Sequence, residues 1–169
     1  MSGVREWIPV STSPKGRLAL SAVKAFGARP FDEVTVAELA TAANVTTGAL
    51  YHHFGSKLGL YAFVREDVER RLLDRMEGAL AASDRSAAVT AAMLVGLDFA
   101  LREGFLRILG DPPAGTEHDR LVELLGRSAG TPVLGRVLAA AWRAALVAVA
   151  EGAEPEQARA AIAALRLGA

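Results

Sequence analysis

The sequence predicts an all-helical protein, and three observations carry this prediction. Ala, Leu, Arg and Glu, which favour helices, dominate the 169 residues. Apolar residues recur at spacings of three and four, whereas few windows alternate apolar and polar residues as a strand does. Helix start and stop signals separate these segments. We therefore expect a succession of helices connected by short turns.

The composition excludes several classes of protein. The chain has no cysteine, which rules out disulfide frameworks, cysteine nucleophiles, iron–sulfur clusters and Cys-type zinc sites. Apolar residues make up 51% and charged residues 22%, as is typical of a globular chain. The first residues lack a signal-peptide pattern, and no uninterrupted apolar run approaches the ~18 residues that span a bilayer. We expect a soluble cytoplasmic protein.

The charge is uneven along the chain. Up to Lys57 there are six basic and four acidic residues, although the whole chain has 19 of each. This excess favours an N-terminal part that faces nucleic acid, but a solvated surface also gives such an asymmetry by chance.

The N-terminal segments show the clearest helix signals. A first helix is expected over residues 15–26, ended by Gly27 and Pro30. A second helix begins with a capping box from Thr35 to Glu38 and ends just before Asn44.

A third, short helix is capped by Thr46 and ends at Phe54. Only about three residues separate it from the second helix, which predicts a helix-turn-helix. Ser56 can cap the long helix that follows. The remaining segments predict a turn at 83–86, a helix to about residue 102, a short helix in 104–110, a loop at 111–115, and helices near 117–127, 133–151 and from 155 onward.

Residues 17–60 resemble the DNA-binding part of TetR-family transcriptional regulators. RLALSAVKAF at 17–26 and FDEVTVAELA at 31–40 are similar to the first two helices of that family, and NVTTGALYHHF at 44–54 with SK at 56–57 is similar to its recognition helix and the start of its fourth helix. The resemblance implies an N-terminal arm and helix-turn-helix domain over 1–57, and a helical ligand-binding and dimerisation domain over 58–169. It also implies a homodimeric, ligand-responsive repressor of a palindromic operator.

The third helix has the residue types that a DNA-reading helix needs. Its leading residues must be small and hydrogen-bonding to enter a major groove that is ~12 Å wide, and later donors can fix the docking on phosphates. From these requirements and the resemblance, the expected DNA-binding residues are Thr35, Thr46, Thr47, Gly48, Ala49, Tyr51, His52 and Lys57.

Structural alternatives stand beside these assignments. Tyr51 can simply cover the first helix, and His52 and His53 point about 100° apart, so one of them is structural. A metal site is not expected, because only His118 remains as a third imidazole. Leu50 and Phe54 are expected in the core, packed on Leu39 and Phe26.

The sequence departs from the family pattern at two points. Pro30 stands where the family usually has Gly, so the turn after the first helix should differ. The leading recognition positions carry no Arg, Lys or Gln, so specificity would depend on thymine methyl contacts, DNA shape or the N-terminal arm. The arm, with Arg5 and Trp7, can lie along a DNA groove or fold back on the domain, and we favour the second.

The resemblance implies an effector site and a dimer interface in the C-terminal helices. The expected effector-binding residues are Phe63, Met76, Met93, Leu97, Asp98, Phe105, Leu121 and Trp142. Apolar residues at helical spacing also form ordinary core. Asp98, which stands among apolar residues, either pairs with Arg102 or orients a polar or cationic ligand.

Dimerisation is expected through the last two helices. One face would consist of Leu134, Val137, Leu138, Trp142, Leu146 and Val149, and the other of Ala158, Ala161, Ile162 and Leu165.

An enzyme is not expected, because the sequence has no Gly-rich phosphate loop, nucleophile elbow or His-Glu metal motif, and no cofactor is predicted. The alternative function is a DNA-binding dimer controlled by a protein partner, or by no effector. A bundle with a void of a few hundred Å³ favours sensing, and a filled bundle favours the alternative.

Overall fold

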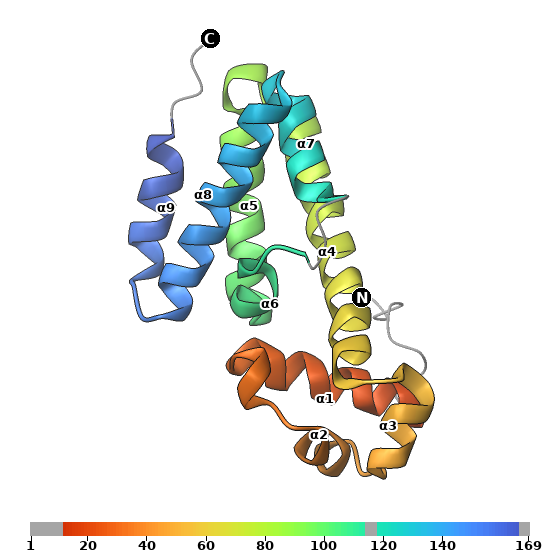
Figure 1. Cartoon of the computed structure of the whole chain (residues 1–169). Helices are drawn as coiled ribbons and strands as arrows, with labels where there is room; N and C mark the ends of the chain where they lie inside the picture. The colour runs from red at the N-terminus through yellow and green to blue at the C-terminus, as the bar shows by residue number, and fades with distance from the viewer. Residues whose placement is uncertain (1–11, 114–117, 166–169) are drawn as a thin grey trace. The chain divides into compact units, whose positions relative to one another are not determined.

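Helices make up all the regular structure in the residues that the computed structural model describes, which are 12–113 and 118–165. The prediction of an all-α chain is therefore confirmed (Figure 1). In chain order the elements are α1 (Pro14–Ala28), the 3₁₀ turn η1 (Phe31–Glu33), α2 (Val36–Ala42), α3 (Thr47–Phe54), α4 (Lys57–Ala82), α5 (Arg85–Glu103), α6 (Leu106–Gly110), α7 (Arg120–Ala129), α8 (Pro132–Ala150) and α9 (Pro155–Ala164).

The chain divides into two compact units, Met1–Val68 and Glu69–Ala169. The division falls inside α4, so this helix contributes to both units. The sequence-based division had placed the functional boundary earlier, at residue 57.

Side-chain caps fix the helix starts of the first unit. The Thr35 hydroxyl accepts a hydrogen bond from the Glu38 N–H at 3.2 Å, and the Thr46 hydroxyl accepts one from the Ala49 N–H at 3.2 Å. Ser56 caps α4 in the same way, at 2.9 Å from the Gly59 N–H. These three predicted caps are confirmed. They satisfy N–H groups that a helix leaves without partners in its first turn.

The turn before α2 differs from the prediction. α1 continues through Gly27 to Ala28, and no sequence signal indicated η1, which Pro30 begins with φ −54°. The Glu38 carboxylate accepts from the Thr35 hydroxyl at 3.1 Å and pairs with Arg29, whereas the capping box predicted a bond to a backbone N–H. No local helix motif links Arg29 to Glu38, because Arg29 lies nine residues earlier in the chain.

The core of the first unit is built on α1 and on aromatic contacts. Leu18, Ala22 and Phe26 of α1 are buried, as the helical spacing predicted. The Phe26 ring stacks on Phe31 with centroids 5.7 Å apart and meets Tyr61 edge-on at 5.0 Å. η1 is thereby attached to both α1 and α4.

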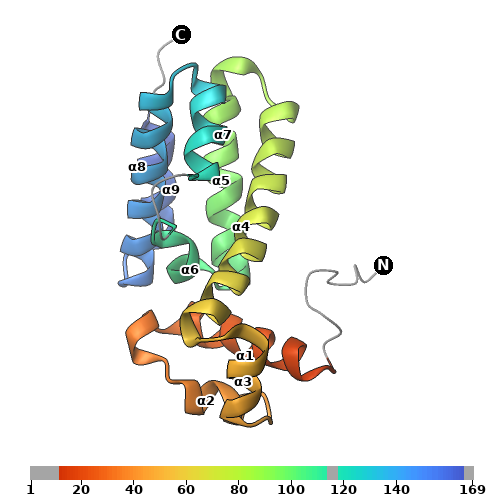
Figure 2. The same cartoon turned by 45° about the vertical axis from the view of Figure 1, so that its right-hand side comes forward.

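The core of the second unit centres on Trp142 of α8. This side chain is fully buried, and its indole N–H donates to the Met93 carbonyl of α5 at 2.9 Å. α7 and α8 pack closely (Figure 2). The approach is so close that a Cβ at Gly135 would clash with the Val122 carbonyl oxygen and lie 2.7 Å from the Cα of Gly126. Glycine is therefore required at this crossing.

α8 is strongly apolar, but only part of its apolar stretch is buried. Among the described helices it is the one that is long and apolar enough to cross a membrane by length and composition, and 33% of its apolar stretch is buried. Arg136 and Arg143 interrupt it, which is why the sequence shows no uninterrupted apolar run. Val133 and Val137 are among the large apolar side chains that α8 leaves exposed.

Candidate DNA-binding site

The predicted recognition residues share one solvent-exposed face of α3. Thr47 and Tyr51 lie one turn apart, as do Gly48 and His52, and all four are exposed. Tyr51 is 53% exposed, which argues against its alternative role as a cover for α1. Leu50 is fully buried on the opposite face, as predicted. α3 therefore presents a short polar face and anchors itself through an apolar one.

The first turn of α3 combines a cap with a small residue. Thr46 stands just before the helix, and its side chain is committed to the Ala49 N–H. A Cβ added at Gly48 would have only the Thr46 hydroxyl within 4 Å, at 3.6 Å. No described part of the first unit therefore requires glycine at this position. Ala49, the next residue of α3 after Gly48, is half-buried.

Thr35 lies at the start of α2, where it serves as the cap described above. It is exposed, so its hydroxyl is accessible although it already bonds to Glu38. The two capping threonines, Thr35 and Thr46, mark the N-termini of α2 and α3, where helix dipoles favour negative groups such as phosphates.

His52 and His53 have different surroundings, as their adjacent positions on a helix require. His52 is exposed and His53 is half-buried, with ring centroids 5.1 Å apart. The His53 ring also meets Phe54 at 6.3 Å. His53 is thus the one that packs within the unit. Among the described residues no group of three potential ligands could hold a metal ion.

The junction between α3 and α4 is held by close backbone contacts. Gly55 ends α3 with φ 74°, a conformation that favours glycine. A Cβ at Gly59 would clash with the Phe54 carbonyl oxygen, so a side chain there would push the two helices apart. The orientation of α3 relative to the start of α4 is therefore tightly determined.

Lys57 has an intramolecular role that its sequence position did not reveal. Its ammonium donates to the carbonyl oxygens of Phe31 and Val34, each at 2.9 Å, and lies 4.1 Å from the Phe31 ring centroid. These contacts tie the start of α4 to η1 across more than 20 residues. The phosphate contact that the sequence predicted would have to use the one remaining hydrogen of this ammonium.

Two further basic residues of α1, which the sequence patterns did not indicate, stabilise the unit. Arg17 donates to the Ala43 carbonyl at 2.8 Å and to the Thr12 carbonyl at 2.5 Å, so it holds the end of α2 and the start of α1 together. The ammonium of Lys15 lies 5.0 Å from the Phe63 ring centroid. Such contacts join residues far apart in the chain, and no local spacing could have indicated them. Arg5 and Trp7 of the predicted arm lie outside the described residues.

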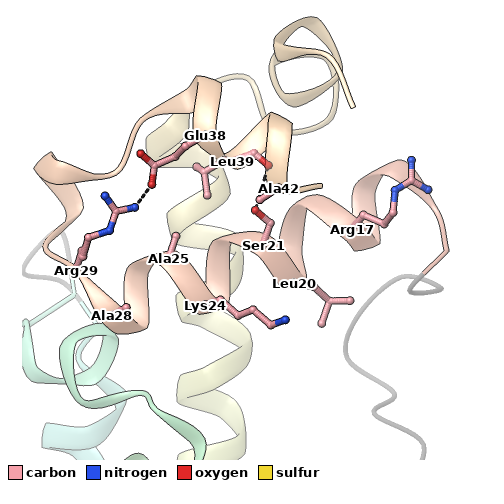
Figure 3. Close-up of a pocket in the computed structure, with 10 residues that line it drawn as sticks. All are labelled: Arg17, Leu20, Ser21, Lys24, Ala25, Ala28, Arg29, Glu38, Leu39 and Ala42. Carbon is pink, nitrogen blue, oxygen red and sulfur yellow. Dashed lines mark hydrogen bonds and ion pairs between the residues drawn. The ribbon is translucent and has the colours of Figure 1, made fainter. Parts of the chain in front are cut away.

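A shallow groove of about 530 Å³ runs between α1 and α2 (Figure 3). Arg17 lies toward one end and the Arg29–Glu38 ion pair toward the other, and the Ser21 hydroxyl donates to the Leu39 carbonyl at 3.0 Å between them. The groove thus marks the seam along which α2 is attached to α1. It contains none of the predicted DNA-binding or effector-binding residues.

Six of the eight predicted effector residues lie in the core of the second unit. Met76, Met93, Leu97, Phe105, Leu121 and Trp142 are each at most 2% exposed and form core of the second unit. Phe63 belongs to the first unit, where its ring packs against Phe54 of α3 with centroids 5.3 Å apart. A Cβ at Gly96 would lie 3.1–3.2 Å from Leu72, Met76 and Trp142, so the side chains around Gly96 are closely packed.

Asp98 lies on the surface of the second unit. Its carboxylate accepts two hydrogen bonds from Arg159 of α9, at 2.5 and 3.0 Å, so its partner is Arg159 and not the predicted Arg102. The pairing raises the pKa of Arg159. Asp98 has apolar neighbours in the sequence, but in the structure it lies on the exposed side of α5. His118 is exposed.

The predicted dimerisation faces mix core and surface. Leu138, Trp142 and Leu146 of α8 are buried within the unit, as are Ala158 and Ile162 of α9. The predicted Leu134 and Val137 are exposed on α8, and the exposed face continues through Val133, Ala140, Ala144 and Ala148. The sequence pattern located an apolar stripe on α8 correctly, but it could not tell which apolar residues the unit uses for its own core.

Comparisons with known proteins place this arrangement in a family. Residues 20–63 match the family model described as bacterial regulatory proteins, tetR family. A TetR-family transcriptional regulator from Pectobacterium atrosepticum is similar at 26% identity, over 89% of each chain and with a TM-score of 0.65. The TetR-family regulator PfmR from Thermus thermophilus is similar at 21% identity, over 94% of this chain and 98% of that one, with a TM-score of 0.63. A TetR-family regulator from Streptomyces coelicolor is similar at 22% identity, over 95% of this chain and 79% of that one, with a TM-score of 0.60. The search of curated proteins gave no match.

The first unit is therefore a helix-turn-helix DNA-binding domain of the kind that bacterial regulators carry. Over residues 20–63 the chain carries the DNA-binding part of the tetR family of bacterial regulatory proteins. It is a DNA-binding transcriptional regulator and not an enzyme.

Proposed function

We propose that this regulator acts in the cytoplasm as a homodimer that represses transcription by binding a palindromic operator through two copies of residues 35–57. The observation that carries the proposal is the exposed polar face of α3, which begins at the Thr46 cap and includes Thr47, Gly48, Tyr51 and His52. Two such faces related by a two-fold axis would enter successive major grooves, ~34–36 Å apart.

The residues of this face divide into base-reading and positioning groups. Thr47, Gly48 and Ala49 come at the start of α3, the end of a recognition helix that approaches the bases. Thr47 can exchange a hydrogen bond with a base edge, and its methyl group, like that of Ala49, can contact a thymine methyl. Tyr51 and His52 follow on the same side and reach toward phosphates, as do the exposed caps Thr35 and Thr46.

We assign Lys57 to positioning. Its ammonium already has two carbonyl partners and an aromatic ring, and it lies directly after the α3–α4 junction. It would support DNA binding by fixing α4, and hence α3, against η1. This assignment replaces the direct phosphate contact expected from its sequence position.

The exposed apolar face of α8 supports the homodimer. Val133 and Val137 are 68% and 56% exposed, and the exposed positions that follow on this face are alanines. Small side chains allow two helices to approach closely across a two-fold axis. α9 offers further exposed alanines, including Ala161.

The packing of the bundle supports the alternative form of control, by a protein partner or by no effector. A small molecule that entered among the six buried residues of the predicted set would have to displace side chains that are at most 2% exposed. It would also have to separate the close contacts around Gly96. Ligand-responsive repression therefore requires the bundle to open first.

The DNA-binding face can be tested directly with a labelled duplex of random sequence, by fluorescence anisotropy at low salt. Gly48→Glu, which places a carboxylate on the proposed face, should abolish binding, because that charge would meet the phosphates. Ala62→Glu, on an exposed position of α4 in the same unit, is the matched control and should bind as the unmodified protein does. Equal binding by both folded variants would show that DNA contacts another surface.

A further inference from the structure

The turn that joins α2 to α3 contains a backbone carbonyl that the two helices leave unpaired. Ala43 is the C-cap of α2, and the next residue, Asn44, is left-handed with φ 51°. The N–H groups of Ala43, Asn44 and Val45 all bond back to carbonyls of α2. No backbone N–H of the described chain donates to the Ala43 carbonyl. This carbonyl is one of the acceptors that a helix end leaves over, and it needs a partner from elsewhere.

Arg17 of α1 supplies that partner. Its Nε donates to the Ala43 carbonyl at 2.8 Å, and its Nη1 donates to the Thr12 carbonyl at 2.5 Å. Both bonds leave one planar guanidinium, so the two carbonyls are held in a defined position relative to each other. Ala43 is buried, which leaves little room for water to replace the arginine. Arg17 therefore fixes the turn from outside the helix-turn-helix.

The orientation of this turn decides the direction of α3. Ala43 lies three residues before Thr46, whose hydroxyl caps α3. Rotation about the bonds that flank the peptide between Ala43 and Asn44 would swing everything that follows it. The left-handed conformation of Asn44 is disfavoured for most residues that carry a Cβ, so a contact that fixes the preceding peptide helps to hold this form of the turn.

Two other side chains of α1 attach α2 along the same groove, but neither reaches the turn (Figure 3). The Ser21 hydroxyl donates to the Leu39 carbonyl at 3.0 Å. That carbonyl also accepts the Ala43 N–H at 3.0 Å, so α2 keeps this helix bond without the serine. Arg29 pairs with Glu38 in the first turn of α2. Both contacts hold the body of α2 and not the turn after it.

We propose that Arg17 is a positioning residue for operator recognition, which fixes the α2–α3 turn and thereby the direction in which α3 presents Thr47 and Gly48 to the bases. The inference rests on the reading of an operator by α3 that is proposed above. Base-edge hydrogen bonds demand a defined distance and angle, whereas phosphate contacts carry no sequence information. A loosened turn should therefore reduce the discrimination between operator and other DNA more than it reduces general affinity for DNA.

A direct phosphate contact is the competing role for Arg17, because its Nη2 has no hydrogen bond to a described residue. The two roles differ in their salt dependence. A lost phosphate contact lowers the slope of log K against log salt by about one and weakens binding to all sequences alike. A lost positioning contact leaves the slope unchanged and acts on the discrimination.

Four full-length variants separate these roles. Arg17→Ala removes both bonds, and Arg17→Lys keeps the charge without the planar fork. Ser21→Ala is the matched control for loss of a bond along the same groove. Lys24→Ala is the matched control for loss of a positive charge from α1, since Lys24 lines the same groove, is exposed and bonds to no described residue. Far-UV circular dichroism checks that each variant is folded.

Fluorescence anisotropy at several salt concentrations measures the affinity of each protein for two duplexes of equal length. One duplex carries the operator recovered by selection with the unmodified chain, and the other carries its scrambled sequence. The ratio of the two affinities is the discrimination, and the salt slope reports phosphate contacts.

We expect Arg17→Ala to lower the discrimination at least about tenfold with an unchanged salt slope, since a displaced α3 loses the geometry of its base contacts. Arg17→Lys should recover part of this, with a loss of about threefold, because an ammonium can still bond to one of the carbonyls. Ser21→Ala and Lys24→Ala should discriminate as the unmodified chain does.

Folded Arg17 variants that discriminate normally would overturn the proposal, as would an equal loss in Ser21→Ala or a slope reduced by about one. Arg17→Lys decides alone if Arg17→Ala does not fold. If selection with the unmodified chain recovers no operator, the proposed function itself fails, and this inference fails with it.

Discussion

The ammonium of Lys57 donates to the carbonyl oxygen of Phe31 at 2.9 Å and lies 4.1 Å from the centroid of the same residue's ring. Phe31 in turn stacks on Phe26 of α1. One lysine at the start of α4 therefore connects the long helix to η1 and to the core of the DNA-binding unit. This connection determines how firmly α3 is held for DNA.

Lys57→Ala should lower the free energy of unfolding by about 1–2 kcal/mol, because two hydrogen bonds from a charged donor are lost. DNA binding should weaken alike for all sequences, while the slope of log K against log salt stays unchanged, since no phosphate contact is removed. Chemical denaturation and anisotropy at several salt concentrations measure both. A slope reduced by about one would show that Lys57 contacts a phosphate directly.

Gly48→Ala separates folding from DNA recognition. No protein atom crowds this position, and alanine favours a helix, so stability should stay the same or rise by up to about 1 kcal/mol. Operator binding should nevertheless weaken about tenfold, because the added methyl group lies where α3 must approach the bases. Unchanged affinity in the folded variant would remove Gly48 from the recognition face.

The filled bundle can be tested with two glycines. Gly78 has no atom within 4 Å of a Cβ added there, whereas a Cβ at Gly96 meets Leu72, Met76 and Trp142 at 3.1–3.2 Å. Both positions lie in helices, so both gain the same helix propensity from alanine. Gly96→Ala should therefore be about 1–3 kcal/mol less stable than Gly78→Ala by denaturant unfolding. Equal stabilities would mean that the bundle has room at Gly96, and an effector pocket there would regain support.

Asp119 predicts a pH dependence of stability. Burial raises the pKa of this carboxyl, but the hydrogen bond and ion pair with Arg143 and the N–H groups of Val122 and Leu121 outweigh it, so the pKa lies below 3.8. A lowered pKa stabilises the fold above the unfolded-state value, and this stabilisation is lost as the pH falls through the folded-state value.

The variant Asp119→Asn keeps the helix cap but not the charge. It should be less stable than the unmodified protein at neutral pH, and the difference should shrink as the pH is lowered toward about 2. Denaturant unfolding at a series of pH values measures this difference. A constant gap between the two proteins would show that the ion pair with Arg143 does not govern the titration.

Local signals in the sequence were sufficient for much of the DNA-binding unit. The caps at Thr35, Thr46 and Ser56 and the left-handed Asn44, with φ 51°, follow from side-chain chemistry within three or four residues. The burial of Leu50 follows from helical spacing. These features depend on neighbours in the chain, and so they can be predicted from it.

Features that depend on distant residues could not be predicted in this way. The carbonyl partners of Lys57 lie 23 and 26 residues earlier, and the partner of Asp98 lies 61 residues later. Burial of Trp142 depends on how α5 and α8 meet, so an apolar spacing alone could not decide between core, effector site and dimer face. Six of the expected effector residues are buried core residues, and the effector site itself stays a prediction.

Two α3 helices that read one operator as a two-fold pair are the core of the proposed function. Selection from randomised duplex DNA with the purified full-length chain, at near-physiological salt, tests this pairing most directly. We predict an inverted repeat whose half-sites are spaced by about one groove repeat, ~34–36 Å. Recovery of a single, unrepeated half-site, or of no motif from a folded protein, would contradict it.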